Sequence, residues 1–300
     1  MLFIHFLIEY VQDISGRIRI NLKTAYFILG MHRSGTSALA GVLNIMGLEF
    51  GSELTKPSEK ENPKGFFENI FVQVLNKKIF SENNSSWDDY TFDINNIEKK
   101  DIDKYIKEAK NILKDEFQYV DNFAIKDPRI CLLFPIWEQA CLDMEIEIKI
   151  IIPYRNPLEV AASLKKRNGF SYEFSFILWM KHFLLSENYS RKYNRIFISF
   201  DDLIYKTPIT LKEILDFLGI DLRKKMQENI DDFLDKNIKH NNIPIKNFSK
   251  DSTLLLQDIF KLIGIKKFED KNKFDSMRKD FYHQLNLFNN KELKDKNSIM

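Results

Sequence analysis

A loop rich in glycine and hydroxyl side chains lies between an apolar run and a helical pattern. Residues 30–37 read GMHRSGTS and follow the apolar run 25–29. The two glycines let the backbone turn tightly, so that consecutive N–H groups can point at one anion. The start of the following helix adds partial positive charge, and Thr36 and Ser37 add hydroxyl donors. The loop therefore predicts a phosphate site rather than a turn that merely starts a helix. Its candidate ligands are Gly30, His32, Arg33, Ser34, Gly35, Thr36 and Ser37.

The same loop differs from that of nucleotide triphosphatases at one informative position. The glycine spacing fits G-x-x-x-x-G-K-[ST], but Thr36 stands where that pattern has lysine. The lysine normally reaches the terminal phosphates beside Mg²⁺, whereas the permanent cation of this loop is Arg33. A P-loop kinase or nucleotide hydrolase stays an alternative. The missing lysine and the lack of a convincing acidic strand end for magnesium count against it.

A second anion anchor is predicted about 120 residues later. Residues 150–163 read IIIPYRNPLEVAAS: a buried strand, an arginine at its end, and a helix that begins at Pro157. Ser163 lies two turns along that helix. The fork of Arg155 and the hydroxyl of Ser163 can together bind a separate phosphate. Taken alone, Arg155 would more often be a surface cation or a strand-end cap.

Two further segments carry groups suited to anion chemistry. The run Lys126-Asp127-Pro128-Arg129 follows a short apolar strand pattern and puts two cations at another strand end. Residues 62–69 read NPKGFFEN and place a carboxylate, Glu68, in a loop that should face the phosphate site.

These segments together resemble the PAPS-dependent sulfotransferases, in particular bacterial members with a P-loop fold; PAPS is 3'-phosphoadenosine 5'-phosphosulfate. The resemblance covers roughly residues 25–219. It implies a three-layer α/β fold, and transfer of a sulfuryl group from PAPS to a hydroxyl or amine acceptor, with no metal. It further implies that the 30–37 loop holds the 5'-phosphate, that Arg33 neutralises charge that grows on the bridging oxygen, and that Arg155 and Ser163 hold the 3'-phosphate.

The general base is the least defined part of this expectation. Glu68 is the leading candidate, because the neighbouring Phe66 and Phe67 can exclude water and raise its basicity. A solvated loop glutamate and a catalytic His32 stay open as alternatives. Lys126 and Arg129 are expected to contact the sulfuryl group or an anionic acceptor, unless they form structural ion pairs.

Elements that could position these groups can be read from the hydrophobic pattern. Short β-branched and aromatic runs alternate with helical patterns, which predicts a parallel sheet with ligands at the carboxyl ends of its strands. The strand runs are 25–29, 123–125, 146–152 and 195–200, and the helical patterns are 36–46, 130–142, 158–167, 209–218, 222–234 and 254–262. We expect a single domain over 1–290, with a helical C-terminal region and a flexible tail at 291–300. The polar insertions 49–69 and 81–103 are candidate lid or acceptor loops.

Composition sets broad limits. The 300 residues are 44% hydrophobic and 29% charged with a formal net charge of +2, so the chain has no global attraction to nucleic acid. No run reaches the roughly 20 apolar residues of a membrane span. Cys131 and Cys141 have no metal or disulfide spacing, which favours buried thiols and a cytoplasmic location. The oligomeric state stays open.

The remaining features are given simpler interpretations. His182 and the aromatic residues of 174–183 have the spacing of a helix that packs on the sheet. Trp87 offers a stacking surface for a carbohydrate or glycolipid acceptor, although a small metabolite or peptide stays possible. Lys239 and His240 resemble late basic residues of the family over two positions only. A non-catalytic nucleotide-binding module is the third alternative function.

Overall fold

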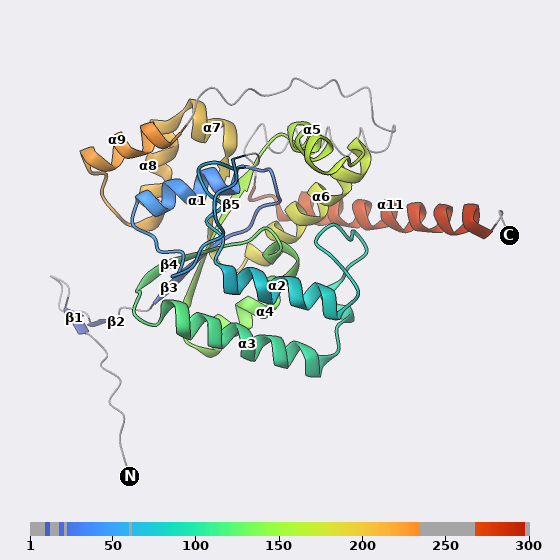
Figure 1. Ribbon diagram of the computed structural model, residues 1–300, viewed down its shortest axis with the longest axis horizontal. Coiled ribbons are helices and arrows are strands. Elements are labelled where there is room, and N and C mark those ends of the chain that lie inside the picture. The colour runs from blue at the N-terminus through green and yellow to red at the C-terminus, as the bar shows by residue number, and fades with distance from the viewer. Residues whose placement is uncertain (1–9, 13–17, 21–22, 60–61, 235–267, 298–300) are drawn as a thin grey trace, which may run out of the picture.

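The computed structural model describes residues 10–12, 18–20, 23–59, 62–234 and 268–297, and its centre is a four-stranded sheet (Figure 1). The strands are β3 (Thr24–Ile28), β4 (Asn122–Lys126), β5 (Glu147–Tyr154) and β6 (Asn194–Ser199), in the order β4-β3-β5-β6. All three pairings are parallel, because helices return the chain between consecutive strands. The predicted parallel α/β fold is confirmed.

The strand register brings the carboxyl ends of three strands to one edge. Ile28 at the end of β3 pairs with Lys126 on one side and with Ile151 on the other. Tyr154 at the end of β5 pairs with Ser199. The 30–37 loop, Lys126 and Arg155 therefore leave the sheet at the same edge, as parallel topology requires.

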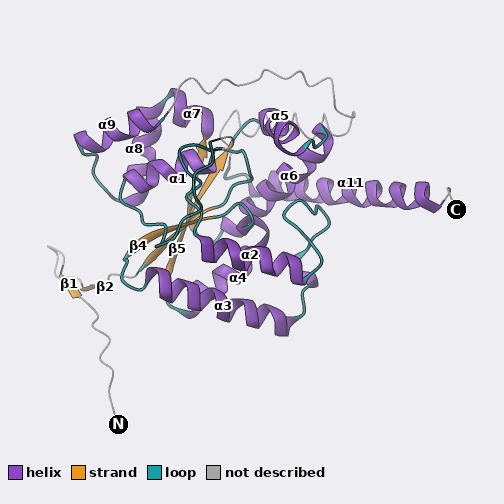
Figure 2. Ribbon diagram, viewed as in Figure 1, coloured by secondary structure: helices purple, strands orange, loops and turns teal. Residues whose placement is uncertain are grey.

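Helices cover both faces of the sheet (Figure 2). Side chains of a strand alternate between the faces, so Phe27 lies in one hydrophobic cluster and Tyr26 and Ile28 in the other. The first cluster is covered by α2 (Ile70–Glu82), α3 (Lys99–Phe117), α4 (Ile130–Asp143), α5 (Pro157–Asn168), α6 (Tyr172–Ser190) and α11 (Lys271–Asn297). The second is covered by α1 (Thr36–Ile45), α7 (Phe200–Tyr205), α8 (Thr207–Leu218) and α9 (Lys224–Phe233).

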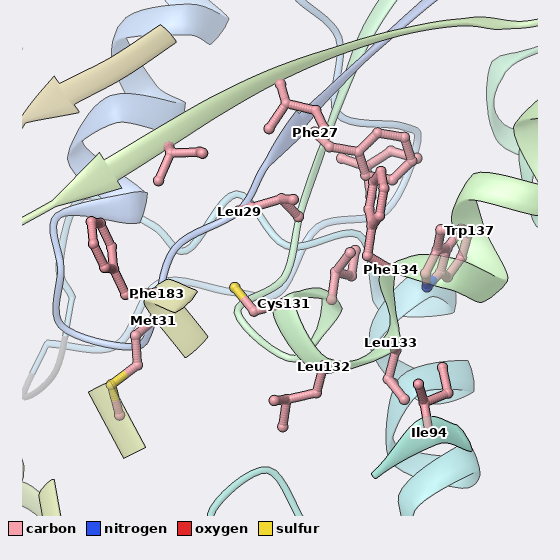
Figure 3. Close-up of a cluster of buried hydrophobic side chains, with 14 of the residues drawn as sticks. Phe27, Leu29, Met31, Ile94, Cys131, Leu132, Leu133, Phe134, Trp137 and Phe183 are labelled. Carbon is pink, nitrogen blue, oxygen red and sulfur yellow. The ribbon is translucent and has the colours of Figure 1, made fainter. Parts of the chain in front are cut away.

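The first cluster supports the base of the 30–37 loop (Figure 3). Phe27 packs edge to face against Phe134 of α4, with 5.3 Å between the ring centroids. Leu29 and Met31, which lie at the start of the loop, are also buried in this cluster. Close packing of large side chains keeps the loop in register with the sheet.

The helix predicted around His182 is present as α6, and His182 is fully buried. Its Nδ1 lies 2.8 Å from the carbonyl oxygen of Leu178, so the neutral tautomer with a proton on Nδ1 satisfies both groups. Burial lowers the pKa of His182 to about 4. The prediction of a core histidine is confirmed.

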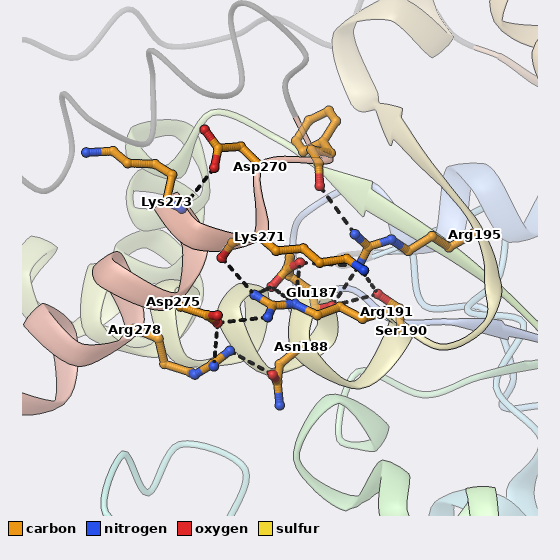
Figure 4. Close-up of polar contacts among 11 residues, drawn as sticks. Glu187, Asn188, Ser190, Arg191, Arg195, Asp270, Lys271, Lys273, Asp275 and Arg278 are labelled. Carbon is orange, nitrogen blue, oxygen red and sulfur yellow. Dashed lines mark hydrogen bonds and ion pairs between the residues drawn. The ribbon is translucent and has the colours of Figure 1, made fainter.

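Helix α11 is joined to α6 through Arg191, which a buried carboxylate orients (Figure 4). Glu187, whose side chain is fully buried, pairs with Arg191 at 2.8 Å and with Arg195 at 3.3 Å. Arg191 also pairs with Asp275 of α11 at 2.8 Å. The C-terminal helix thereby joins the layer that carries α6. The helix runs to Asn297, and the flexible tail expected over 291–300 stays a prediction.

The region 81–103 is more helical than predicted. It contains the end of α2, a short 3₁₀ helix (Ile94–Asn96) and the start of α3. Near the N-terminus, β1 (Tyr10–Gln12) and β2 (Ile18–Ile20) pair with each other in a separate antiparallel sheet. Lys239, His240 and the helical pattern 254–262 lie outside the described residues.

Two expectations from composition can be compared with the structure. Cys131 and Cys141 are both free and buried, as predicted, and burial raises the pKa of Cys131 to about 12. Within the described part of the chain, no helix is both long enough and apolar enough to cross a membrane.

Candidate active site

The loop between β3 and α1 presents an open helix start at the sheet edge. Gly35 is the N-cap of α1 with a φ of 86°, and no side chain caps the helix. Because the first N–H groups of a helix have no partner within it, an uncapped start is suited to an anion. A Cβ on Gly35 would lie 2.3 Å from Phe200 Cδ2, so this position accepts only glycine.

Arg33 also adopts left-handed backbone geometry, with a φ of 69°. This conformation costs a non-glycine residue energy, and such strain is often found at functional sites. Its Nε donates to Ser163 Oγ at 2.7 Å. The second anchor thus meets the first loop directly, through Ser163 of α5.

Arg155 directly follows the end of β5, as predicted. Its Nε donates to Glu159 Oε2 at 2.8 Å, and its guanidinium stacks on the ring of Phe200 at 4.6 Å from the centroid. These contacts orient the guanidinium, and Arg155 lines a cavity of about 300 Å³. We call this the donor cavity, after the role that is proposed for it below; its lining includes Arg33, Gly35, Thr36, Ser37, Asn62, Lys64, Arg155 and Phe200.

A buried ion pair lies beside the start of α1. Lys126 Nζ is 2.7 Å from Glu68 Oε1, and the two side chains are 2% and 7% exposed. Lys126 Nζ also donates to Phe66 O at 2.9 Å and to Ser37 Oγ at 3.2 Å. Gln73 Nε2 donates to the other Glu68 oxygen at 2.8 Å. Glu68 is therefore an ordered, buried carboxylate and not a solvated loop residue.

Arg129 is held by a chain of buried polar groups. Its guanidinium pairs with Asp127 Oδ1 at 2.7 Å, and Asp127 Oδ2 accepts from Asn76 Nδ2 at 3.0 Å. Trp137 Nε1 donates to Asn76 Oδ1 at 2.9 Å. Asp127, Asn76 and Trp137 are fully buried. The structural ion pair that was left open as an alternative is thus present, and Arg129 also lines a second cavity.

The second cavity has a volume of about 490 Å³ and shares Arg33, Thr36, Ser37 and Asn62 with the donor cavity. We call it the acceptor cavity, again after its proposed role. Its other lining residues are His32, Thr55, Phe66, Glu68, Gln73, Lys77, Trp87, Lys126, Pro128, Arg129, Arg167 and Asn168. Two cavities that meet at one arginine and one helix start can bring two molecules into contact there.

His32 packs against Trp87, with 4.3 Å between the ring centroids. Burial and the nearby charges of Arg129 and Arg167 keep its pKa well below the usual range. Its Nε2 is buried without a hydrogen-bond partner among the described residues. The imidazole at the edge of the acceptor cavity is therefore neutral near pH 7.

The structure does not bring all predicted ligands into a cavity. Gly30 packs against Pro153, where an added Cβ would lie 2.7 Å from the Pro153 ring, so this glycine allows close packing rather than ligand contact. Ser34 is buried, and its Oγ has no partner within the described chain. Ser163 is not among the residues that line either cavity, and it contacts Arg33 rather than Arg155.

Several lining residues were not identified from the sequence as site residues. Lys64 belongs to the NPKGFFEN run, and its position in that run could have identified it as a residue that lines the donor cavity. Lys77 and Arg167 lie near the middle of α2 and the end of α5, where they look like ordinary surface cations. Only the packing of the helices shows that both line the acceptor cavity. Among the described residues, no group of three or more His, Cys, Asp or Glu side chains could hold a metal ion.

Comparisons with known proteins identify the family of the chain. A family model described as "Sulfotransferase domain" matches residues 23–296. No curated protein matches the chain.

Similar solved structures include the sulfotransferase domain of the olefin synthase from Synechococcus PCC 7002, which is 17% identical; the match covers 84% of this chain and 98% of that one, with a TM-score of 0.49. Sulfotransferase STF9 from Mycobacterium avium is 12% identical, with coverages of 80% and 75% and a TM-score of 0.48. Mouse sulfotransferase SULT7A1, complexed with PAP, is 18% identical, with coverages of 77% and 72% and a TM-score of 0.39. Because the family model spans nearly the whole described domain, the chain belongs to the sulfotransferase domain family.

Proposed function

We propose that this protein transfers a sulfuryl group from PAPS to a hydroxyl or amine acceptor, and that the acceptor is a carbohydrate or glycolipid. The observation that carries the proposal is the junction of the two cavities. An uncapped helix start and Arg33 lie there, and the buried Lys126–Glu68 pair contacts the junction through Ser37, which accepts from Lys126 Nζ at 3.2 Å. Cytoplasmic location belongs to the same proposal.

The donor cavity would hold the nucleotide. The N–H groups of Gly35, Thr36 and Ser37 would bind the 5'-phosphate at the start of α1. Arg155 would bind the 3'-phosphate with its fork, and Lys64 extends the positive lining of the cavity. Ser163 would act by orienting Arg33, because its Oγ accepts from that side chain.

Transfer would occur at the junction. The acceptor oxygen attacks the sulfur in line, the bond from sulfur to the bridging oxygen breaks, and adenosine 3',5'-bisphosphate (PAP) leaves. Arg33 and Lys126 would stabilise the negative charge that grows on the bridging oxygen. Glu68 would take the acceptor proton, since it lines the acceptor cavity and is buried; His32, a neutral imidazole in the same cavity, is the alternative base.

The experiment is a transfer assay with PAPS labelled with ³⁵S at the sulfuryl group and a panel of sugars, glycolipids, phenols and amines. We expect label in a carbohydrate acceptor and a matching release of PAP, without added metal. Transfer of phosphate from γ-labelled ATP with Mg²⁺ would instead favour the kinase alternative. Binding of PAP without label transfer to any acceptor would favour a non-catalytic module.

A further inference from the structure

Both carboxylate oxygens of Glu68 accept a hydrogen bond from a side chain. Lys126 Nζ donates to Oε1 at 2.7 Å, and Gln73 Nε2 donates to Oε2 at 2.8 Å. A bond from an ammonium group stabilises negative charge on an oxygen more than a bond from a neutral amide does. Oε2, the oxygen bonded to Gln73, is therefore the one that takes a proton more readily, at its second lone pair.

The start of α2 explains how Gln73 reaches this oxygen. Asn69 caps the helix, because its Oδ1 accepts from Phe71 N and Val72 N at 3.0 and 3.2 Å. Glu68 immediately precedes the cap, and Gln73 N donates to Asn69 O at 3.0 Å, one turn into the helix. Side chains of a helix tilt toward its N-terminus, so the Gln73 amide extends back toward the cap and meets Glu68.

A charged group at its other end orients the Gln73 amide. Lys77 Nζ, one turn further along α2, donates to Gln73 Oε1 at 2.8 Å. With Oε1 on the ammonium group, Nε2 faces the carboxylate. The flipped amide would put an oxygen against Glu68 and a donor against Lys77. Nε2 also lies 3.4 Å from Thr55 Oγ1, a second group that can accept from it. The hydrogen-bond pattern thus favours one orientation of the amide.

We infer that Gln73 is a positioning residue, which holds Glu68 Oε2 in place to take the acceptor proton. As the proton moves to Oε2, the acceptor oxygen bonds to sulfur, the bond from sulfur to the bridging oxygen breaks, and PAP leaves. Both residues line the acceptor cavity, and the Glu68 side chain is 7% exposed, so water is a poor substitute for the amide donor. The inference rests on the proposed function and deepens it, because it adds a residue that acts through the base.

The first test measures label transfer from ³⁵S-labelled PAPS to the fastest acceptor of the panel of sugars, glycolipids, phenols and amines. Gln73→Met keeps the length of the side chain without its donor, so kcat should fall by about tenfold, with acceptor KM and PAP affinity retained. Gln73→Glu places a second carboxylate beside Glu68, so kcat should fall further. Gln139→Met is the matched control, because Gln139 Nε2 donates to Asp143 Oδ1 at 2.7 Å on the exposed side of α4.

A double-mutant cycle measures whether Gln73 acts through Glu68. In the Glu68→Gln background, Gln73→Met should change kcat by less than about twofold, because the group that it positions is gone. Thermal unfolding of each variant identifies losses that come from the fold. Equal losses in the two backgrounds, or an unchanged kcat in Gln73→Met, would overturn the inference. A raised acceptor KM with kcat retained would also overturn it, because Gln73 would then bind the acceptor.

A spectroscopic test needs neither PAPS nor an acceptor. In ¹⁵N-labelled protein, the side-chain NH₂ signal of Gln73 is identified by its loss in Gln73→Met. It should shift in Glu68→Gln and stay in place in Glu53→Gln, since Glu53 is exposed in the same loop. A signal that does not shift in Glu68→Gln would overturn the inference alone. PAP binding without label transfer to any acceptor, or transfer that Glu68→Gln leaves unchanged, would overturn the proposed function or its base, and the inference with it.

Discussion

The donor and acceptor cavities are built in different ways, although they share Arg33 and the start of α1. Backbone geometry makes much of the donor side: an uncapped helix, a glycine at φ 86° and a strand end, all within short segments. Side chains from separated segments make the acceptor side, with Trp87 before α3, Lys77 on α2 and Arg167 on α5. The first kind of site is fixed by local spacing, whereas the second depends on how the helices pack.

The largest effect is expected from a change to the backbone of the donor side. Gly35→Val would put side-chain atoms into the ring of Phe200 and force a β-branched residue to a φ of 86°. We expect PAP affinity measured by calorimetry to fall by at least ~1,000-fold. Gly219→Ala is the matched control, because Gly219 has a φ of 72° with no atom within 4 Å of an added Cβ. Retained PAP binding in a folded Gly35→Val protein would show that the helix start does not hold the nucleotide.

The next largest effect is expected from a change that affects the acceptor cavity and not the donor cavity. Glu68→Gln removes the proposed base and keeps the shape of the side chain, so the rate of sulfuryl transfer should fall by about 100-fold. PAP affinity should change little, because Glu68 lines the acceptor cavity and not the donor cavity. Glu53→Gln, in the same loop but exposed, is the control.

The Glu68→Gln change also leaves Lys126 buried without its carboxylate, so thermal unfolding should be measured alongside. If the rate is unchanged and His32→Gln lowers it instead, the proton is taken by His32.

A smaller effect is expected at the aromatic wall. Trp87→Ala removes the ring face and its packing on His32 and Phe170, so the KM for a saccharide acceptor should rise by about tenfold. Trp87→Phe should recover part of this loss. A change in PAP affinity as large as the change in KM would mean that the two cavities are not independent.

The smallest effect is expected on the pH dependence of the free energy of unfolding. His32 and His182 both have depressed pKa values in the folded protein, the latter about 4, because burial disfavours the charged imidazole. The unfolded chain therefore binds more protons below about pH 6.5. The contribution of the two neutral histidines to the free energy of unfolding is fully present above that pH and is lost as the pH falls toward 4. The slope is at most about 1.4 kcal/mol per pH unit for each histidine.

Urea unfolding of wild type and His182→Gln at pH 7.5, 6.5 and 5.5 measures this slope. The variant should show a weaker pH dependence between pH 6.5 and 5.5. An equal slope in the two proteins would show that His182 does not titrate on unfolding.

The contrast between the two cavities also explains what the sequence could predict. The runs around Phe27 and Ile150 are strongly apolar and end at turns, so the parallel sheet and the positions of the 30–37 loop and Arg155 follow from local pattern. Helix α3 was missed, although its buried Tyr105, Ala109 and Leu113 recur every four residues, because its other faces are polar and it adjoins an Asn-rich stretch.

Contacts over long sequence separations were harder to predict. The Lys126–Glu68 pair joins residues 58 positions apart, and the bond from Arg33 to Ser163 spans 130 positions. No local pattern encodes such pairings. The bond from Arg33 to the Ser163 hydroxyl could therefore not be predicted, and the role of Ser163 in binding a phosphate stays a prediction.

The most direct test of the donor site is calorimetric binding of PAP, compared with AMP and with ATP plus Mg²⁺, on wild type and on Arg155→Ala. We predict that PAP binds at least about tenfold more tightly than AMP, and that Arg155→Ala removes this advantage, because AMP lacks the 3'-phosphate. A preference for ATP with Mg²⁺, or a PAP affinity equal to that for AMP, would contradict a PAPS site in the donor cavity.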